Sequence, residues 1–201
     1  MFLESPTHNG SIEIVTGSMF SGKTEELIRR LRRAKIAGLE TRIFKPLTDS
    51  RYSASDVVSH DRNFIESDAV AASDDILTLC GNAKVIGIDE AQFFDDGLIE
   101  VCKGLAASGV RVIIAGLDMD YLGRPFGPMG ALMAIADDVS KVHAICTKCG
   151  SLAQFSYRKN SDRQLVSLGE KDIYEPLCRE CFKQAQEKPE NVFSNEIAAA
   201  G

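Results

Sequence analysis

The chain has 201 residues, 44% of them hydrophobic, with a formal net charge of −6 and a sequence pI of about 5.2. This length and apolar content allow one main core with a small appendage. The negative charge disfavours a nucleic-acid binder, and the lack of a leader-like or membrane-spanning apolar run predicts a soluble cytoplasmic protein without a membrane partner.

Short apolar runs alternate with helix-like stretches as far as about Val142. Strands are predicted at 11–16, 41–45, 84–89 and 111–117, and helices near 24–37, 96–108 and 128–137. Such alternation predicts an α/β fold with a mostly parallel sheet covered by helices. After Val142 the sequence changes to cysteine pairs and polar residues, which predicts a small second part and a loose tail.

The first predicted strand leads into a glycine-rich loop that fits the pattern G-x-x-x-x-G-K-[ST]. In such a loop backbone N–H groups surround phosphate oxygens, the lysine reaches the outer phosphates and the hydroxyl residue ligates Mg²⁺. The strand before it and the helix after it make a plain glycine turn the weaker alternative. The pattern predicts a P-loop (RecA-like) nucleotide site formed by Gly17, Ser18, Met19, Phe20, Ser21, Gly22, Lys23 and Thr24.

The predicted strand 84–89 ends in an acidic pair, Asp89 and Glu90. A carboxylate at this place in a P-loop enzyme faces the phosphates, so Asp89 is expected to hold Mg²⁺ together with Thr24. Glu90 can accept a proton from an attacking hydroxyl or water, which is typically worth ~10²–10⁴ in rate. The alternative is that Glu90 only caps or pairs at a helix start.

Two C-x-x-C pairs have the spacing of zinc ligands: Cys146, Cys149, Cys178 and Cys181. Four protein ligands close a tetrahedral Zn²⁺ site, so the metal would be structural and would tie down the base of the segment 150–177. Redox thiols are the alternative, and disulfides are disfavoured in a reducing compartment. Cys80 and Cys102 have no partner pattern and are expected to be ordinary core or surface thiols.

Absent motifs narrow the choice of phosphate acceptor. No N-K-x-D sequence occurs, which argues against a guanine-specific switch protein, and a helicase or recombinase would need a longer chain and a basic track. A small phosphotransferase remains, with an acceptor shielded from water by a lid rooted in the zinc site. Two other classes stay open: a zinc-lidded nucleoside monophosphate kinase, and a non-catalytic or nucleic-acid-linked ATPase with a zinc ribbon.

Several stretches also carry a resemblance to a known family, in both order and spacing. They read GSMFSGKT, KPLTDSRY, SHDR, IGIDEAQFF, AGLDMDYLGRPFG, and CTKCG through CREC. Over roughly residues 10–183 the chain resembles the type II, zinc-containing thymidine kinases. This resemblance implies transfer of the γ-phosphate of ATP to the 5′-hydroxyl of thymidine or deoxyuridine, with Mg²⁺ and structural zinc, in a homotetramer inhibited by dTTP.

The resemblance also implies roles for individual residues at the phosphates. Glu90 matches the family's proton acceptor, and Arg51 is expected to join Lys23 as a cation that offsets charge in the transition state. Taken without the family, Asp49 and Arg51 would instead be a solvated turn with a surface ion pair. To the P-loop, the implied ATP site adds Asp49, Arg51, Asp89, Glu90, Ala91 and Gln92.

A thymidine pocket follows from the same resemblance. Its implied walls are Met19, Phe93, Leu117, Tyr121 and Phe126, with Tyr174 in the lid. Each of these alone is more often ordinary core, but a flat apolar slot with an aromatic face suits a methylated pyrimidine. Family members often have Phe at the position of Tyr121. The resemblance therefore implies that the Tyr121 ring stacks on the base, but it does not assign a hydrogen-bond partner to the Tyr121 hydroxyl.

Main-chain groups of the lid are implied to read the thymine edge. They belong to Leu165, Val166, Ser167, Leu168 and Gly169. Because a purine differs in edge and size, this readout predicts selectivity for pyrimidines.

The expected organisation is a flexible N-terminus (1–10), a P-loop α/β domain (11–142), a zinc-binding lid or lasso (143–185) and a flexible tail (186–201). In the helix after the P-loop, apolar residues are expected to face the core: Leu27, Ile28, Leu31 and Ala34. The opposite, solvent-facing or subunit-facing side then carries Arg29, Arg30, Arg32 and Arg33.

Overall fold

The computed structural model describes residues 10–47, 56–58, 64–159 and 173–187. Its centre is a six-stranded sheet in the order β5-β2-β6-β7-β1-β8, and every neighbouring pair runs parallel. The strands are β1 (Ser11–Thr16), β2 (Thr41–Pro46), β5 (Asp68–Val70), β6 (Val85–Ile88), β7 (Arg111–Gly116) and β8 (Asp138–Lys141). The prediction of an α/β fold with a parallel sheet is confirmed.

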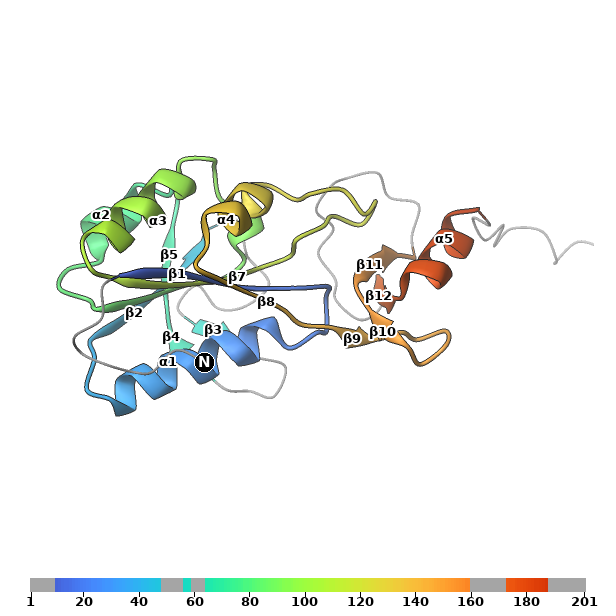
Figure 1. Cartoon of the computed structure of the whole chain (residues 1–201), viewed down its shortest axis with the longest axis horizontal. Helices are drawn as coiled ribbons and strands as arrows, with labels where there is room; N and C mark the ends of the chain where they lie inside the picture. Colours follow the sequence, from blue (N-terminus) through green and yellow to red (C-terminus); the bar gives the residue numbers. More distant parts are fainter. Residues whose placement is uncertain (1–9, 48–55, 59–63, 160–172, 188–201) are drawn as a thin grey trace, which may run out of the picture.

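Helices cover both faces of this sheet, as parallel strands require. Figure 1 shows α1 (Lys23–Ile36) on one face, and α2 (Asp75–Leu79), α3 (Leu98–Ala107) and α4 (Met129–Ile135) on the other. Each face has its own cluster of buried apolar side chains. Among the described helices, none is both long and apolar enough to cross a membrane.

The helix α1 packs closely on the middle of the sheet. Its predicted apolar face is buried, with Leu27, Ile28, Leu31 and Ala34 against β1, β2, β6 and β7. A Cβ atom added at Gly87 in β6 would lie 2.7 Å from Cδ1 of Leu31, so the glycine lets the Leu31 side chain approach the strand closely. The start of α1 is therefore held close to the ends of these strands.

The arginine-rich side of α1 follows the sequence expectation at Arg29 and Arg32, which are exposed. For Arg30 the expectation is wrong. Its guanidinium donates at 2.8 Å to the carboxylate of Glu13, a buried residue of β1, and Arg111 of β7 donates at 2.6 Å to the same carboxylate. A buried carboxylate needs such partners, so Arg30 joins α1 to the sheet instead of facing solvent.

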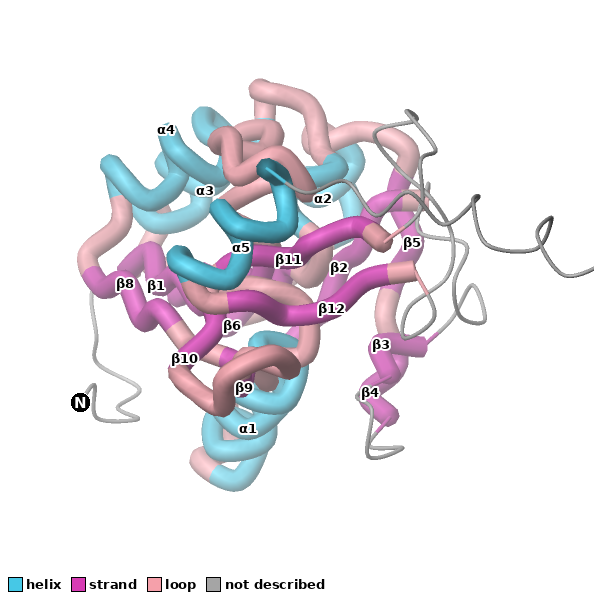
Figure 2. Tube along the Cα trace, turned by 90° about the vertical axis from the view of Figure 1, so that its right-hand side faces the viewer, coloured by secondary structure: helices cyan, strands magenta, loops and turns pink. Residues whose placement is uncertain are grey.

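The cysteine-rich part of the chain follows β8 and forms a smaller antiparallel unit. Its elements are β9 (Ala144–Ile145), β10 (Leu152–Ala153), β11 (Phe155–Arg158), β12 (Tyr174–Leu177) and α5 (Arg179–Glu187). β9 pairs with β10 and β11 pairs with β12, and α5 lies over the second pair (Figure 2). We call these residues, 144–159 and 173–187, the cysteine lobe.

The cysteine lobe has its own apolar core, separate from the two that cover the sheet. It consists of Ala144, Cys146, Ala153, Phe155, Leu177 and Phe182. A further hairpin, β3 (Asp56–Val58) with β4 (Phe64–Glu66), stands apart from the main sheet. The domain boundaries expected from the sequence remain predictions.

Candidate active site

The glycine-rich loop joins the end of β1 to the start of α1. Positive φ angles at Gly17 (147°) and Gly22 (84°) turn the backbone, and Gly22 caps α1 without any side-chain hydrogen bond to the first-turn N–H groups. Lys23 folds back over the loop, where its Nζ donates at 2.8 Å to the carbonyl oxygen of Ser18. A cation and a helix N-terminus face the same small space, an arrangement suited to phosphate.

Two oxygen groups meet where β6 ends beside α1. The hydroxyl of Thr24 donates at 3.3 Å to Oδ2 of Asp89, a buried residue that directly follows β6. The other oxygen of Asp89 accepts the backbone N–H of Glu90 at 3.0 Å. Hydroxyl and carboxylate oxygens are ligands that Mg²⁺ prefers, so the donors expected from the sequence lie together in the fold.

Glu90 has a backbone conformation that is rare for its residue type. Its φ of 52° and ψ of 39° lie in the left-handed region, at the residue before the short 3₁₀ helix Ala91–Phe93. Its carboxylate makes no capping bond to that helix and instead accepts Nε2 of Gln92 at 2.6 Å. Non-glycine residues held in this region cost of order 1–3 kcal/mol and gather at functional sites.

Gln92 connects Glu90 to the neighbouring strand. Its side chain is 2% exposed, and Oε1 accepts the backbone N–H of Leu117, just after β7, at 2.9 Å while Nε2 donates to Glu90. The residue thus uses both ends of its amide to hold the carboxylate against the sheet. Both a donor and an acceptor are needed for these two contacts, which an amide side chain provides. The expected part of Gln92 in ATP binding stays a prediction.

We expect Gln92→Leu to lower kcat about tenfold and to destabilise the fold by about 1–3 kcal/mol. The reason is that the Leu117 N–H would be buried without a partner and Glu90 would lose its donor. Steady-state kinetics and thermal unfolding measure the two effects.

Gln184→Leu is the matched control for Gln92→Leu. Gln184 donates to Glu180 at 2.8 Å in the same way, but from the exposed surface of α5. Its change should alter neither quantity, and a Gln92→Leu enzyme with normal turnover would show that Glu90 needs no support from Gln92.

Aromatic side chains lie on the chain segments that follow β6 and β7. The rings of Phe93 and Phe126 meet edge to face, with 5.5 Å between centroids and planes at 87°. Leu117 and Phe126 are both 9% exposed. Because parallel strands end at the same sheet edge, these residues stand on the side of the sheet that carries Glu90 and the glycine-rich loop.

Tyr121 and Tyr174 are brought together by a residue that the sequence did not single out, Arg158 of β11. Its guanidinium carbon lies 4.0 Å from the ring centroid of Tyr121 and 5.2 Å from that of Tyr174, and Nε donates at 3.1 Å to the Tyr174 hydroxyl. Arg158 is 5% exposed. Cation–π contact and hydrogen bonding together fix both tyrosines. A lone arginine in a short strand carries no sequence signal for such a role.

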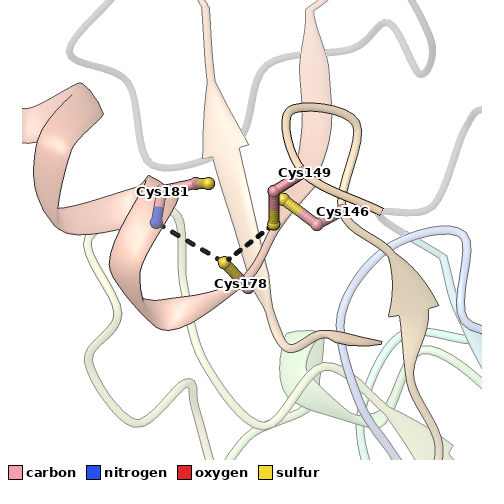
Figure 3. Close-up of side chains that lie close together, drawn as sticks. All are labelled: Cys146, Cys149, Cys178 and Cys181. Carbon is pink, nitrogen blue, oxygen red and sulfur yellow. Dashed lines mark hydrogen bonds between the residues drawn. The ribbon is translucent and has the colours of Figure 1, made fainter. Parts of the chain in front are cut away.

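The four predicted zinc ligands converge at one point of the cysteine lobe. The sulfur atoms of Cys146, Cys149, Cys178 and Cys181 all lie within 4.8 Å of one another, and Figure 3 shows the two pairs facing each other. Sγ of Cys149 and Sγ of Cys178 are 3.6 Å apart. Zinc bound tetrahedrally at 2.3 Å would separate its sulfurs by roughly 3.8 Å, so the geometry fits the ion.

Protonation in this cluster differs from one thiol to the next. Hydrogen bonds from Ser151 lower the pKa of Cys149 to about 6, whereas hydrogen bonding with Cys178 raises the pKa of Cys181 to about 12. Adjacent thiolates repel each other, and a divalent cation offsets that repulsion. All six cysteines are free thiols; Cys102 is buried and Cys80 half-buried, as expected for residues outside a metal site.

Some predicted site residues lie outside the described part of the chain. They are Asp49 and Arg51 near the phosphates, and the lid residues Leu165, Val166, Ser167, Leu168 and Gly169. Their roles remain predictions.

The structure is that of a P-loop nucleotide-binding α/β protein, because a glycine-rich loop follows the first strand of a parallel sheet and an acidic pair lies beside that loop. The chain belongs to the thymidine kinase family, whose model matches residues 10–182. It is 61% identical to a thymidine kinase of Bacteroides fragilis over 183 residues, which cover 91% of this chain and 92% of that protein. The thymidine kinase of Bdellovibrio bacteriovorus is 49% identical over 181 residues, 90% of this chain and 89% of that protein. The predicted family is confirmed.

Proposed function

We propose that this chain transfers the γ-phosphate of ATP to the 5′-hydroxyl of thymidine or deoxyuridine, in pyrimidine deoxynucleoside salvage, with Glu90 as the general base. The observation that carries the proposal is the position of Glu90. It follows Asp89 directly at the end of β6, is held by Gln92, and belongs to the same segment as the aromatic Phe93. A carboxylate there lies between a phosphate site and an apolar slot.

The phosphate side of the reaction uses groups of the glycine-rich loop. Its backbone N–H groups and Lys23 bind and orient the phosphates, and Arg51 adds a second cation near the transferring group. Thr24 and Asp89 would hold Mg²⁺, which supplies charge neutralisation at the phosphate oxygens. Glu90 accepts the proton of the 5′-hydroxyl as the hydroxyl oxygen bonds to the γ-phosphorus, while the bond from that phosphorus to the oxygen bridging the β-phosphate breaks and ADP leaves.

The nucleoside side of the reaction uses apolar and main-chain groups. Phe93, Phe126 and Leu117 form one wall of the slot for the base, and Tyr121 with Tyr174, both fixed by Arg158, form another. Met19 belongs to the loop between these groups and the phosphates. Main-chain atoms of residues 165–169 read the pyrimidine edge and exclude purines by size.

The four-cysteine cluster supports a structural Zn²⁺ site, because four thiols leave no position open for substrate or water. The family resemblance further supports inhibition by dTTP, assembly as a homotetramer and a cytoplasmic location.

The deciding test is transfer of radiolabel from [γ-³²P]ATP to an acceptor. Thymidine and deoxyuridine are expected to be labelled, whereas deoxycytidine, deoxyadenosine and dTMP are expected to be poor acceptors. A preference for dTMP would replace the proposal with a nucleoside monophosphate kinase. Hydrolysis that depends on nucleic acid and not on nucleoside would replace it with an ATPase, and comparable kcat/KM for purines would contradict the main-chain readout.

A further inference from the structure

The glycine-rich loop is bonded to the cysteine lobe as well as to the sheet. The backbone N–H of Met19 donates at 2.9 Å to the hydroxyl of Ser156 in β11. The hydroxyl of Ser18 donates at 3.4 Å to the carbonyl oxygen of Ala153 in β10. Two consecutive residues of the phosphate-binding loop are thus tied to two strands that lie more than a hundred residues further along the chain.

Phe20, the next residue, packs its ring against the core of the cysteine lobe. This core includes the metal-site residue Cys146, and Cys178 and Cys181 pack against the same cluster. Phe20 is also, with Glu90, one of two non-glycine residues in the described chain with a positive φ, here 64°. A left-handed conformation is unfavourable for a residue with a side chain, and the apolar contact with the lobe helps to offset this cost at Phe20.

Loop shape matters because the loop binds phosphate through its backbone. The N–H groups must point inward before ATP arrives, and a loop that must be ordered on binding has a lower affinity. Inside the loop, the hydroxyl of Ser21 and Nζ of Lys23 both donate to the carbonyl oxygen of Ser18, at 2.7 and 2.8 Å, while Gly17, Phe20 and Gly22 have positive φ angles. The bonds from Ser18 and Met19 to the cysteine lobe and the packing of Phe20 add to these internal bonds.

We propose that the cysteine lobe holds the phosphate-binding loop in its binding shape, and that Phe20 is the positioning residue through which the lobe's metal supports ATP binding. This inference rests on the ATP and zinc sites of the proposed function. The zinc site would then support ATP binding as well as anchor a lid. Loss of the metal would loosen the lobe core, and Phe20 would no longer hold the glycine-rich loop in order.

The first test compares two variants at this position. Phe20→Ala removes the anchor, whereas Phe20→Leu keeps an apolar side chain that can pack in the lobe. We expect Phe20→Ala to raise the Kd for Mg·ATP about tenfold, measured by calorimetry without thymidine, and to retain wild-type zinc content. Phe20→Leu should stay within about threefold of the wild type.

Leu152→Ala is the matched control for these variants. It removes an apolar side chain from β10 of the same lobe, but one that is 65% exposed and lies outside the lobe core. ATP affinity and zinc content should not change. Hydrogen exchange at residues 17–24 should rise in Phe20→Ala and not in Leu152→Ala, a readout that does not depend on activity.

The second test is a cycle that combines zinc removal with Phe20→Ala. If Phe20 transmits the effect of the metal, chelation should weaken ATP binding about tenfold in the wild type and little further in Phe20→Ala. Equal fold-losses in both would overturn the proposal, as would wild-type ATP affinity in Phe20→Ala. If zinc removal also unfolds the sheet, as judged by circular dichroism, the ATP affinities of Phe20→Ala and Phe20→Leu with zinc bound test the proposal instead.

The inference and the proposed function fail in different ways. A wild-type chain that binds no ATP would overturn the proposed function and this inference with it. A wild-type chain that binds ATP and phosphorylates thymidine, with Phe20→Ala unchanged in affinity and in loop exchange, would overturn the inference alone.

Discussion

Replacing Glu90 by glutamine is expected to lower kcat by about two or more decades while ATP binding stays near the wild-type value. Glutamine has almost the same shape, and its carbonyl oxygen can still accept the hydrogen bond that Gln92 donates at 2.6 Å. It cannot take up the proton of the 5′-hydroxyl. Measurement of kcat with thymidine, together with a separate calorimetric Kd for ATP, distinguishes lost chemistry from lost binding.

The control for this change is Glu100→Gln. Glu100 lies on α3, and its carboxylate bonds to Lys103 at 2.8 Å on the protein surface. The same loss of charge there should leave kcat and the Kd for ATP unchanged. Near-wild-type turnover of Glu90→Gln would remove Glu90 from the role of base and leave its left-handed backbone without a catalytic explanation.

Replacing Cys146 by serine is expected to reduce bound zinc from about one ion per chain to almost none and to abolish thymidine binding. Cys146 is the one buried ligand of the cluster and is also part of the apolar core of the lobe. Losing the metal therefore loosens the strands that carry Arg158 and Tyr174, while the sheet keeps its two separate cores. Metal analysis, thymidine titration and thermal unfolding measure these effects.

Cys80→Ser is the control for the zinc prediction, because Cys80 is a half-buried thiol that packs against a core of the sheet and donates its S–H to the carbonyl oxygen of Leu77. Zinc content and thymidine binding should be normal in that variant. A Cys146→Ser chain that keeps both would contradict a four-cysteine site, and joint melting of sheet and lobe would count against a separable lobe.

The regular core elements could be predicted because the apolar residues that they bury form runs or periodic patterns in the local sequence. β1 begins and ends at the predicted residues, β2 and β7 differ by one residue at one end, and β6 is shorter by one residue at each end. The predicted helix near 128–137 is shorter, since Ala136 is already extended and the chain enters β8. β8 was missed because an edge strand with the sequence DVSK, half of it exposed, has no apolar run.

The small elements were missed for a related reason. β5 has three residues, β9 and β10 have two each, and α2 has five, so none is long enough to show a period. In the cysteine lobe, metal-ligand spacing was the stronger signal, and it located all four cysteines. Spacing within the chain cannot reveal contacts between distant segments. The role of Arg158 and the bond that the Met19 N–H donates to Ser156 are therefore seen only in the structure.

The place of β8 in the sheet has a consequence for how this protein can be divided. Because β8 pairs with β1, the chain leaves the sheet next to the glycine-rich loop, where Val142 donates to the carbonyl oxygen of Thr16 at 2.8 Å. A Cβ atom at Gly17 would collide with the carbonyl oxygen of Val142 at 2.1 Å. The first residues after the sheet therefore lie directly against the glycine-rich loop, so a fragment cut before residue 138 would lack one neighbour of that loop.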